Sequence, residues 1–503
     1  MNEKLNNALD QISDKHLSEA ENYKRRHPWW IAAVAAVLVL AIGIALIPGN
    51  LFGTESNLEG STPGVPTGYP PTNPTDPTFT TAPPYLHNLV AYPRYPEMAP
   101  FPSADQYGEE WEAYDEALRA WMQSQGAQYN QPDGYADSLY NFFDESIRQF
   151  LTGEENAAYS PLSVYLAIAM LAETTDGNSR QQILDLFGLE SMEQLRTQVS
   201  HLWNAHYCSD GRTDLLLANS LWLDTQYSFR QNTLNTLASN YFASAFYGDL
   251  GTEAVDAQLR RWMNDHTGGL LYEQAQNLSM DPATVFALVS TVFFTARWED
   301  EFAEKNTSDA VFHSPKEDVT VPFMNQTLYY GCYYWGSNFG AVRLQLSGNN
   351  DMWLILPDEG YKVADILESD EYLQMTLHPG VWENRKDNMI IHLSLPKFDV
   401  ASNNLDLIAG MQAMGITDVF DPAVSDFSPM TDTPMLYVDQ MLHSARVAID
   451  EKGCVGAAYT VIMIPGAGMP GEEEMDFVLD RPFLFVVSSR DNLPVFAGAV
   501  LQP

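Results

Sequence analysis

The sequence predicts an α+β fold with a largely antiparallel β-sheet, and two observations support this prediction. Apolar residues with helical spacing come early in the folded part of the chain, beginning with Phe142, Phe143, Ile147 and Phe150. Strand-like runs rich in β-branched and aromatic residues follow at residues 215–223, 285–294, 352–356, 390–395 and 435–449. Because helices and strands do not alternate strictly, their order disfavours a parallel α/β sheet.

The composition limits the classes of partner. Among 503 residues, 66 are Asp or Glu and 26 are Lys or Arg, so the formal net charge is -40. Nucleic-acid binding depends on Lys and Arg, so this balance predicts no nucleic-acid partner. The acidic excess fits a solvated surface, or electrostatic steering of a basic protein partner. Cys208, Cys332 and Cys454 form neither a disulfide framework nor a zinc-binding spacing.

The N-terminal segment predicts a membrane anchor. Residues 1–28 are polar and end in a basic cluster, and residues 29–48 form a run of 20 residues without charge. This run is long enough to cross a bilayer of roughly 30 Å as a transmembrane helix. Basic residues before it predict a cytoplasmic leader and an extracellular C-terminal part. A cleaved signal peptide is the alternative, with a shorter apolar core and a small-residue cleavage site. The 28-residue leader and the weak cleavage signal around residues 45–47 favour the anchor over the signal peptide. We therefore expect an uncleaved, single-pass signal anchor in the cell membrane.

A linker is expected after the anchor, over residues 49–105. Residues 51–104 contain 12 of the 30 prolines and one basic residue, which predicts an extended stalk of about 3.1 Å per residue without a packed core. Residues 106–134 are expected to form a short helical extension, and residues 135–503 a folded domain. A basic flank, an anchor and a Pro/Thr-rich stalk in this order are typical of a bacterial surface protein.

Ser160 precedes Pro161 and an apolar helical run, which predicts a capped helix beginning there. Ser160, Ser163 and His443 could also form a nucleophile and its base, as in a surface serine hydrolase. The sequence contains no Ser-x-x-Lys, Gly-x-Ser-x-Gly, His-Glu-x-x-His or phosphate-loop motif. The pattern therefore favours a buried polar cluster, and it predicts no catalytic residue, no metal site and no cofactor.

The loop of residues 451–470 carries the most specific signal. It begins Glu-Lys-Gly, lies between two strand-like runs and continues with small or β-branched residues. Period-2 alternation puts Cys454, Gly456 and Ala458 on one face, which is small enough to enter a core. Proline and glycine from Pro465 onward predict an exposed turn. A segment that can be either strand or loop indicates a two-state element.

Together these segments resemble the serpin family of serine protease inhibitors over residues 135–503. The resemblance rests on short motifs whose order and spacing match along the domain. They are Asn156…Ser160-Pro161-Leu162-Ser163, Ala218-Asn219-Ser220-Leu221, Trp262…Thr267-Gly268-Gly269, Leu288-Val289-Ser290, Leu395-Pro396-Lys397-Phe398, His443, Glu451-Lys-Gly453 and Arg481-Pro482-Phe483. The resemblance implies the serpin fold, in which helices surround a large central β-sheet and a reactive-centre loop is exposed.

The resemblance also implies an activity. In inhibitory serpins a serine protease attacks the loop and forms a covalent acyl-enzyme; the cut loop then inserts as a new strand in the central sheet and distorts the protease. Insertion gives the loop backbone two neighbouring strands and buries alternate side chains. The resemblance therefore implies an irreversible suicide-substrate inhibitor of serine endopeptidases and not an enzyme.

The hinge of the loop corresponds to Glu451, Gly453, Cys454, Val455, Gly456, Ala457 and Ala458. Cys454 replaces the usual Thr or Ser, and no bulky or charged hinge residue would face the core, which favours an inhibitory member. A non-inhibitory serpin acting as a binding or adhesion module is the alternative. The family's usual spacing places the scissile bond between Ala467 and Gly468, with Met469 and Met463 as alternates. An alanine before this bond predicts an elastase-like target protease.

Two further clusters follow from the resemblance. Lys397 and Trp298 match residues of the breach, the opening of the central sheet where insertion starts, and Lys397 is expected to pair with Glu451. A second cluster, the shutter, lies where the central strands part. Its matching residues are Asn156, Ser160, Ser163, Ser290 and His443, with Ser290 in place of a usual asparagine.

Overall fold

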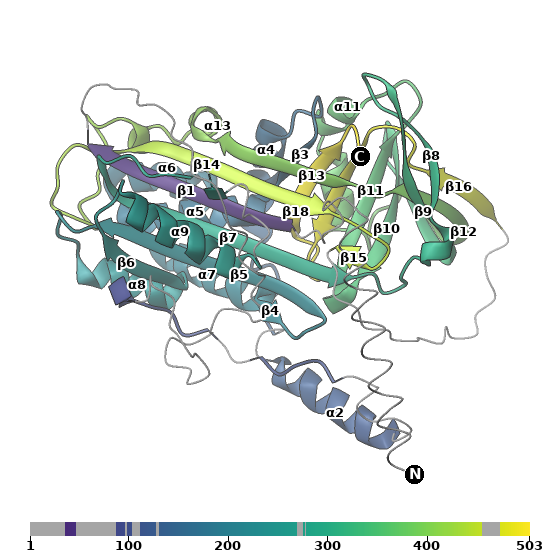
Figure 1. The fold of residues 1–503 in the computed structure, drawn as a ribbon, viewed down its shortest axis with the longest axis horizontal. Coiled ribbons are helices and arrows are strands. Elements are labelled where there is room, and N and C mark those ends of the chain that lie inside the picture. Colours follow the sequence, from purple (N-terminus) through teal and green to yellow (C-terminus); the bar gives the residue numbers. More distant parts are fainter. Residues whose placement is uncertain are drawn as a thin grey trace, which may run out of the picture.

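The computed structural model describes residues 36–46, 87–95, 98–102, 111–126, 130–268, 275–276, 278–454 and 473–503. Two large β-sheets, with helices packed around them, account for most of this part of the chain (Figure 1). Among the described strands, all the pairs are antiparallel except two, one in each sheet. The α+β class and the largely antiparallel pairing expected from the sequence are therefore confirmed.

The first sheet has nine strands in the described part of the chain. Their order is β13 (Asp399–Asp406), β14 (Leu436–Ala448), β1 (Ala36–Leu46), β7 (Thr284–Arg297), β5 (Thr213–Asp224), β6 (Ala243–Gly248) and β2 (Leu89–Ala91), with β15 (Gly453–Cys454) beside β7 and β4 (Cys208–Ser209) beside β5. The strand β5 is buried along its whole length, and β7 is buried except near its C-terminal end.

The second sheet also has nine strands in the described part. Their order is β16 (Glu474–Val478), β12 (Arg385–Pro396), β9 (Asp318–Trp335), β10 (Phe339–Leu346), β11 (Asn350–Pro357), β17 (Phe483–Ser488), β18 (Pro494–Val500) and β3 (Ala157–Tyr159), with β8 (Ser308–His313) beside β9. The short strand β3 leads directly into the helix that lies between this sheet and the first one.

Helices pack on both faces of the first sheet (Figure 1). The longer helices are α2 (Trp111–Ser124), α4 (Tyr140–Phe150), α5 (Pro161–Thr174), α6 (Gly177–Leu186), α7 (Met192–His206), α8 (Gln231–Asn240) and α9 (Glu253–His266), and the shorter ones are α11 (Val363–Leu367), α12 (Glu371–Leu377) and α13 (Ile408–Ala413). Every residue of α5 is buried, because its sequence is apolar around its whole circumference and the helix contacts β7 and β18.

The predicted transmembrane helix over residues 29–48 is not found. Residues 36–46 instead form β1, which lies between β14 and β7 and is antiparallel to both (Figure 1, purple). Within the residues that the structure describes, no helix is both long enough and apolar enough to span a bilayer. An uninterrupted apolar run fits a strand with neighbours on both sides as well as it fits a helix, and its periodicity does not distinguish the two.

The expected linker over residues 49–105 also needs correction near its end. The strand β2 pairs with β6, and the ring of Tyr95 stacks on those of Trp203 and Tyr207, each at 5.6 Å between centroids. Aromatic residues in this stretch thus pack on the domain despite the prolines around them. Residues 51–86 lie outside the described residues.

Candidate functional site

The hinge begins where β14 ends, and its first residues enter the first sheet. Gly453 pairs with Arg297 and Cys454 pairs with Ala296, so the chain runs beside β7. Gly453 has a φ of +149°, and a Cβ atom there would lie 2.3 Å from the carbonyl oxygen of Ala296. Only glycine fits this approach. Cys454 is fully buried, and this burial raises the pKa of its thiol to about 12.

The carboxylate of Glu451 is bonded by two side chains, those of Lys397 directly after β12 and Thr307 directly before β8. Its Oε1 lies 2.6 Å from Nζ of Lys397 and accepts a hydrogen bond of 2.8 Å from Oγ1 of Thr307. Burial alone would raise the pKa of this carboxyl group, but the hydrogen bonds from Lys397 and Thr307 outweigh it and lower the pKa. The structure thus contains the Lys397–Glu451 pair that the resemblance implies. These contacts hold the side chain of the first hinge residue in place.

Trp298 lies beside this pair and holds the turn that follows β14. Its indole Nε1 donates a 2.8 Å hydrogen bond to the carbonyl oxygen of Asp450, and its backbone N–H donates to that of Lys452 at 3.0 Å. The ring is buried and packs edge-on against Phe302 at 5.9 Å. Lys397, Trp298 and Glu451 therefore form one cluster at the start of the hinge.

A second cluster lies beneath the middle of the first sheet. Ser160 is the N-cap of α5, as its sequence predicts, and its Oγ accepts from the N–H of Ser163 at 3.4 Å. The N–H of Ser160 donates to Nε2 of His443 at 3.3 Å, and Oγ of Ser163 donates to Oγ of Ser290 at 3.3 Å. The helix start thereby contacts both β14 and β7.

The strand β1 separates the two halves of this cluster. Leu40 is in register with His443 on β14 and with Ser290 on β7. His443 is fully buried, and its Nδ1 has no hydrogen-bond partner among the described residues. Burial lowers the pKa of His443 to about 3, so its imidazole is neutral near pH 7. One buried polar atom is thus left unsatisfied at the centre of the site.

The same geometry argues against the serine-hydrolase alternative. Ser160 and Ser163 are fully buried, and Nε2 of His443 accepts a backbone N–H. A general base must instead accept the proton of the serine hydroxyl. The three residues therefore form a packed polar cluster and not a nucleophile–base pair.

Asn156 does not join the shutter cluster, contrary to the prediction. Its Oδ1 accepts hydrogen bonds from the N–H groups of Leu501 and Gln502 at 2.7 and 3.0 Å, and its Nδ2 donates to the carbonyl oxygen of Gln502 at 2.6 Å. Its side chain satisfies the backbone just past β18, because β3 and β18 are paired and bring the two segments together.

The remaining predicted site residues lie outside the described residues. They are Val455, Gly456, Ala457 and Ala458 of the hinge, and Ala467, Gly468, Met469 and Met463 around the expected reactive bond.

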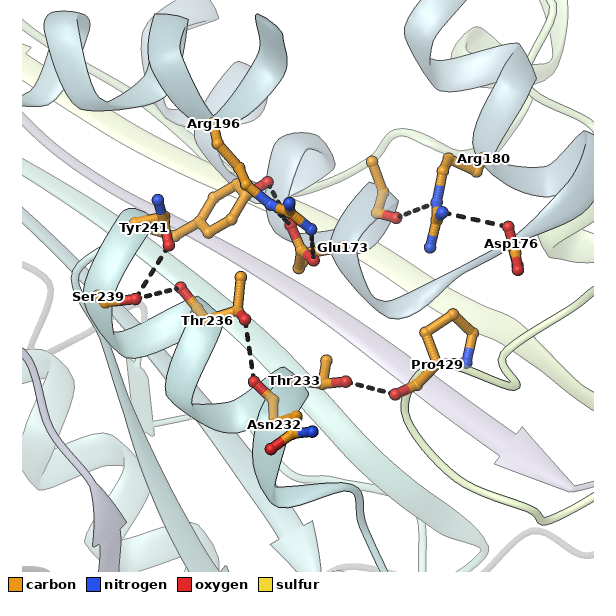
Figure 2. A network of polar contacts seen from close by, with 12 residues as sticks. Glu173, Asp176, Arg180, Arg196, Asn232, Thr233, Thr236, Ser239, Tyr241 and Pro429 are labelled. Atoms are coloured by element: carbon orange, nitrogen blue, oxygen red, sulfur yellow. Dashed lines mark hydrogen bonds and ion pairs between the residues drawn. The ribbon is translucent and has the colours of Figure 1, made fainter. Parts of the chain in front are cut away.

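A polar network that the sequence did not predict connects the C-terminal end of α5 to α7 and to the end of α8 (Figure 2). Nε and NH2 of Arg196 on α7 donate to the two carboxylate oxygens of Glu173 at 2.9 and 2.6 Å. The hydroxyl of Tyr241 donates to Oε2 of the same carboxylate at 2.9 Å. Burial, and then the charge of Glu173, raise the pKa of Tyr241 well above its usual range. These residues are far apart in sequence and match no motif, so only the fold reveals them.

Comparisons with known proteins agree with this geometry. A family model described as Serpin (serine protease inhibitor) matches residues 137–503. Alpha-1-antiproteinase 2 of Equus caballus is 28% identical over 379 residues, covering 73% of this chain and 86% of that protein. The crystal structure of the thermophilic serpin tengpin in the native state has a TM-score of 0.64 at 24% identity, covering 74% of this chain and 95% of tengpin. Thyroxine-binding globulin in complex with thyroxine has a TM-score of 0.61 at 22% identity, covering 73% and 98% of the two chains. At these identities the two solved structures are evidence for the fold alone.

Proposed function

This chain belongs to the serpin family of protease inhibitors, and on that premise we propose that it is an irreversible suicide-substrate inhibitor of elastase-like serine endopeptidases. The hinge carries the proposal. Gly453 and Cys454 already pair with Arg297 and Ala296 beside β7. Each further residue of a cut loop would add to the same ladder of backbone hydrogen bonds and so extend β15 along β7.

The residues after the hinge have the sizes that such a strand needs. Cys454 is fully buried, and alternation would turn Gly456, Ala458 and Thr460 toward the same side after insertion. None of these side chains is charged or large. The same alternation turns Tyr459 to the opposite side, where its volume is tolerated.

Incubation with pancreatic elastase tests the proposal. Denaturing gel electrophoresis is expected to show a covalent adduct, and mass spectrometry a released peptide that begins at Gly468. Loop cleavage without an adduct would contradict the inhibitor proposal. A peptide that begins after Met463 or Met469 would move the reactive bond to one of these alternates.

A pair of hinge variants separates insertion from recognition. Ala458→Arg places a charge on the face that would be buried, so we expect elastase to cut the loop with the adduct yield reduced at least tenfold. Ala457→Arg is the matched control, because the neighbouring position points to the opposite side. Equal adduct yields from the two variants would contradict insertion in the proposed register.

We also propose that the domain is displayed outside the cell, with residues 29–48 in the cell membrane. The support is the length of this uncharged run and the basic cluster before it. Alkaline carbonate extraction of membranes should leave the full chain in the pellet, and protease added to intact cells should remove the domain. Recovery of the intact chain in the soluble fraction would contradict this location.

One observation favours the non-inhibitory alternative. The strand β1 lies between β14 and β7, which is where an inserted loop would have to lie. A serpin whose central sheet is already filled would be cut by a protease without trapping it, and it would retain only binding or adhesion.

A further inference from the structure

We propose that residues 36–46 and the reactive loop compete for one position in the first sheet, and that a lipid bilayer arms the inhibitor by withdrawing residues 36–46. This inference rests on the inhibitory function proposed above. It explains how a chain with a complete hinge and a filled sheet can still act as a trap.

The pairing register shows that the two segments cannot both be in place. Gly453 and Cys454 pair with Arg297 and Ala296, so a continuing strand would bring Gly456 opposite Phe294. That partner is already taken, because Ala36 is paired with Phe294. Both strands would run antiparallel to β7, so the overlap continues along it.

The opposite edge of the gap is equally occupied. The strand β1 pairs with β14 from Arg446, opposite Val37, to Leu436, opposite Leu46. A loop inserted between β7 and β14 needs the backbone groups of both strands. We therefore infer that the form with β1 in the sheet is a protease substrate, and that trapping requires β1 to leave.

The shutter cluster distinguishes the two occupants. In the register above, Thr460 of the inserted loop would be opposite Ser290, the position now held by Leu40. Leu40 is also in register with His443, whose buried Nδ1 finds no hydrogen-bond partner within the described ranges. Because Nε2 of the neutral imidazole accepts the N–H of Ser160, its Nδ1 carries the proton. Leucine has no hydrogen-bonding atom in its side chain, whereas a threonine hydroxyl can accept from this Nδ1–H. The loop is thus the better occupant after it has been cut.

Before the loop is cut, the membrane supplies the force that removes β1. The strand lies inside the run of 20 uncharged residues, and a helix formed by this run in a bilayer would satisfy all its own backbone groups. Lipid therefore binds one of the two states of this segment and not the other, which shifts the population toward an open gap.

Proline substitution tests the inference in the full-length chain. Ala41→Pro removes a backbone N–H in the middle of β1, which a strand with two neighbours does not tolerate, whereas membrane helices tolerate proline. Ala33→Pro is the matched control, because it lies in the same apolar run but before the strand begins. Each protein is examined in buffer and in phosphatidylcholine–phosphatidylglycerol vesicles, by hydrogen exchange and by adduct formation with elastase.

Hydrogen exchange reports the gap directly. In buffer, residues 36–46 of the wild type and of Ala33→Pro should be protected, and those of Ala41→Pro should exchange at least tenfold faster. Vesicles should remove the protection of β7 and β14 along their facing edges in the wild type. Protection of these edges that is unchanged by vesicles and by Ala41→Pro would overturn the inference, whatever elastase does.

Adduct formation separates this inference from the proposed function. In buffer we expect at least tenfold more adduct from Ala41→Pro than from wild type or Ala33→Pro, and vesicles should bring the wild type to the level of Ala41→Pro. Adduct that forms in buffer with equal yield from all three proteins would overturn the competition. Open gaps by exchange, with cleavage and no adduct, would overturn the inhibitory function and leave the competition for the gap supported.

A disulfide provides an independent lock that does not depend on proline. Ala41 and Val289 are register partners, and paired strands hold Cα atoms at a separation that a disulfide can bridge. The double variant Ala41→Cys with Val289→Cys should form adduct in vesicles at least tenfold less when oxidised than when reduced. Equal yields in a sample shown to be cross-linked would overturn the inference.

Discussion

The two ends of helix α5 hold polar clusters of opposite character. At its C-terminal end, both oxygens of the buried Glu173 carboxylate are bonded, by Arg196 and by Tyr241 (Figure 2). At its N-terminal end, a pair of serine hydroxyls is joined by one 3.3 Å bond, and Nδ1 of His443 has no hydrogen-bond partner in the part of the chain that the structure describes. A fully satisfied charge network fixes a helix in place, whereas an incompletely satisfied neutral cluster can exchange partners without breaking an ion pair. The contrast indicates that the C-terminal end of α5 is anchored. Its N-terminal end adjoins β1, the strand that we propose leaves the sheet.

The largest effect is expected at the anchored end. Glu173→Ala leaves Tyr241 without its acceptor and Arg196 without its partner, and we expect about 3 kcal/mol of lost unfolding free energy because Arg196 is only partly exposed. Urea unfolding measures this loss. Glu173→Gln keeps the shape and one acceptor and should lose less. A loss below about 1 kcal/mol for Glu173→Ala would remove the distinction between the two ends.

Acid should weaken the other end selectively. The pKa of His443 is lowered to about 3 by burial, below the value of about 6.5 in an unfolded chain. The unfolded state therefore binds the proton first, so stability is present above pH 6.5 and is lost as pH falls from there toward 3. The slope approaches about 1.4 kcal/mol per pH unit, or about 2 kcal/mol between pH 6.5 and pH 5.

The variant His443→Gln isolates this contribution. Glutamine keeps an acceptor for the N–H of Ser160 but does not titrate, so the acid-dependent loss should be smaller than in the wild type. His313→Gln is the control, since the exposed His313 is bonded to Asp318, which raises its pKa. Its contribution has the opposite sign and fades as pH rises. Identical acid profiles for wild type and His443→Gln would show that His443 is not buried neutral.

A smaller effect is expected for the serine pair. Ser290→Ala removes a neutral hydrogen bond and leaves Oγ of Ser163 without this partner, which should cost about 1 kcal/mol. A double-mutant cycle with Ser163→Ala is the control, and the double variant should lose less than the sum of the two single variants. Strict additivity would mean that the two hydroxyls do not interact.

The smallest effect is expected for an ion pair that Figure 2 shows near the anchored end but at the surface. NH1 of Arg180 lies 3.1 Å from Oδ1 of Asp176, whose side chain is exposed. Asp176→Ala should cost less than about 0.5 kcal/mol and become neutral in high salt. A loss comparable to that of Glu173→Ala would show that burial does not decide the strength of these pairs.

The sequence predicted the parts of this site whose partners are local or whose motif is shared with relatives. The cap at Ser160 follows from a serine before a proline and an apolar run, and the Lys397–Glu451 pair follows from the family resemblance. Thr307 and the Glu173–Arg196 pair were missed, because nothing local indicates which distant residues the fold brings together. The strand β1 was missed for a different reason, since an apolar run carries no period that separates a buried strand from a membrane helix.

The pairing of β3 with β18 has a consequence for biosynthesis. The side chain of Asn156 bonds the N–H of Leu501, which lies 345 positions later in the chain. At about 5–20 residues per second, a ribosome needs roughly 20–70 seconds to translate that interval. During this time β3 lacks its partner β18, and β11, once made, lacks its partner β17, so the nascent protein presents unpaired strand edges to the cell. Chaperones that shield such edges during translation should therefore determine how much of this protein reaches its native state.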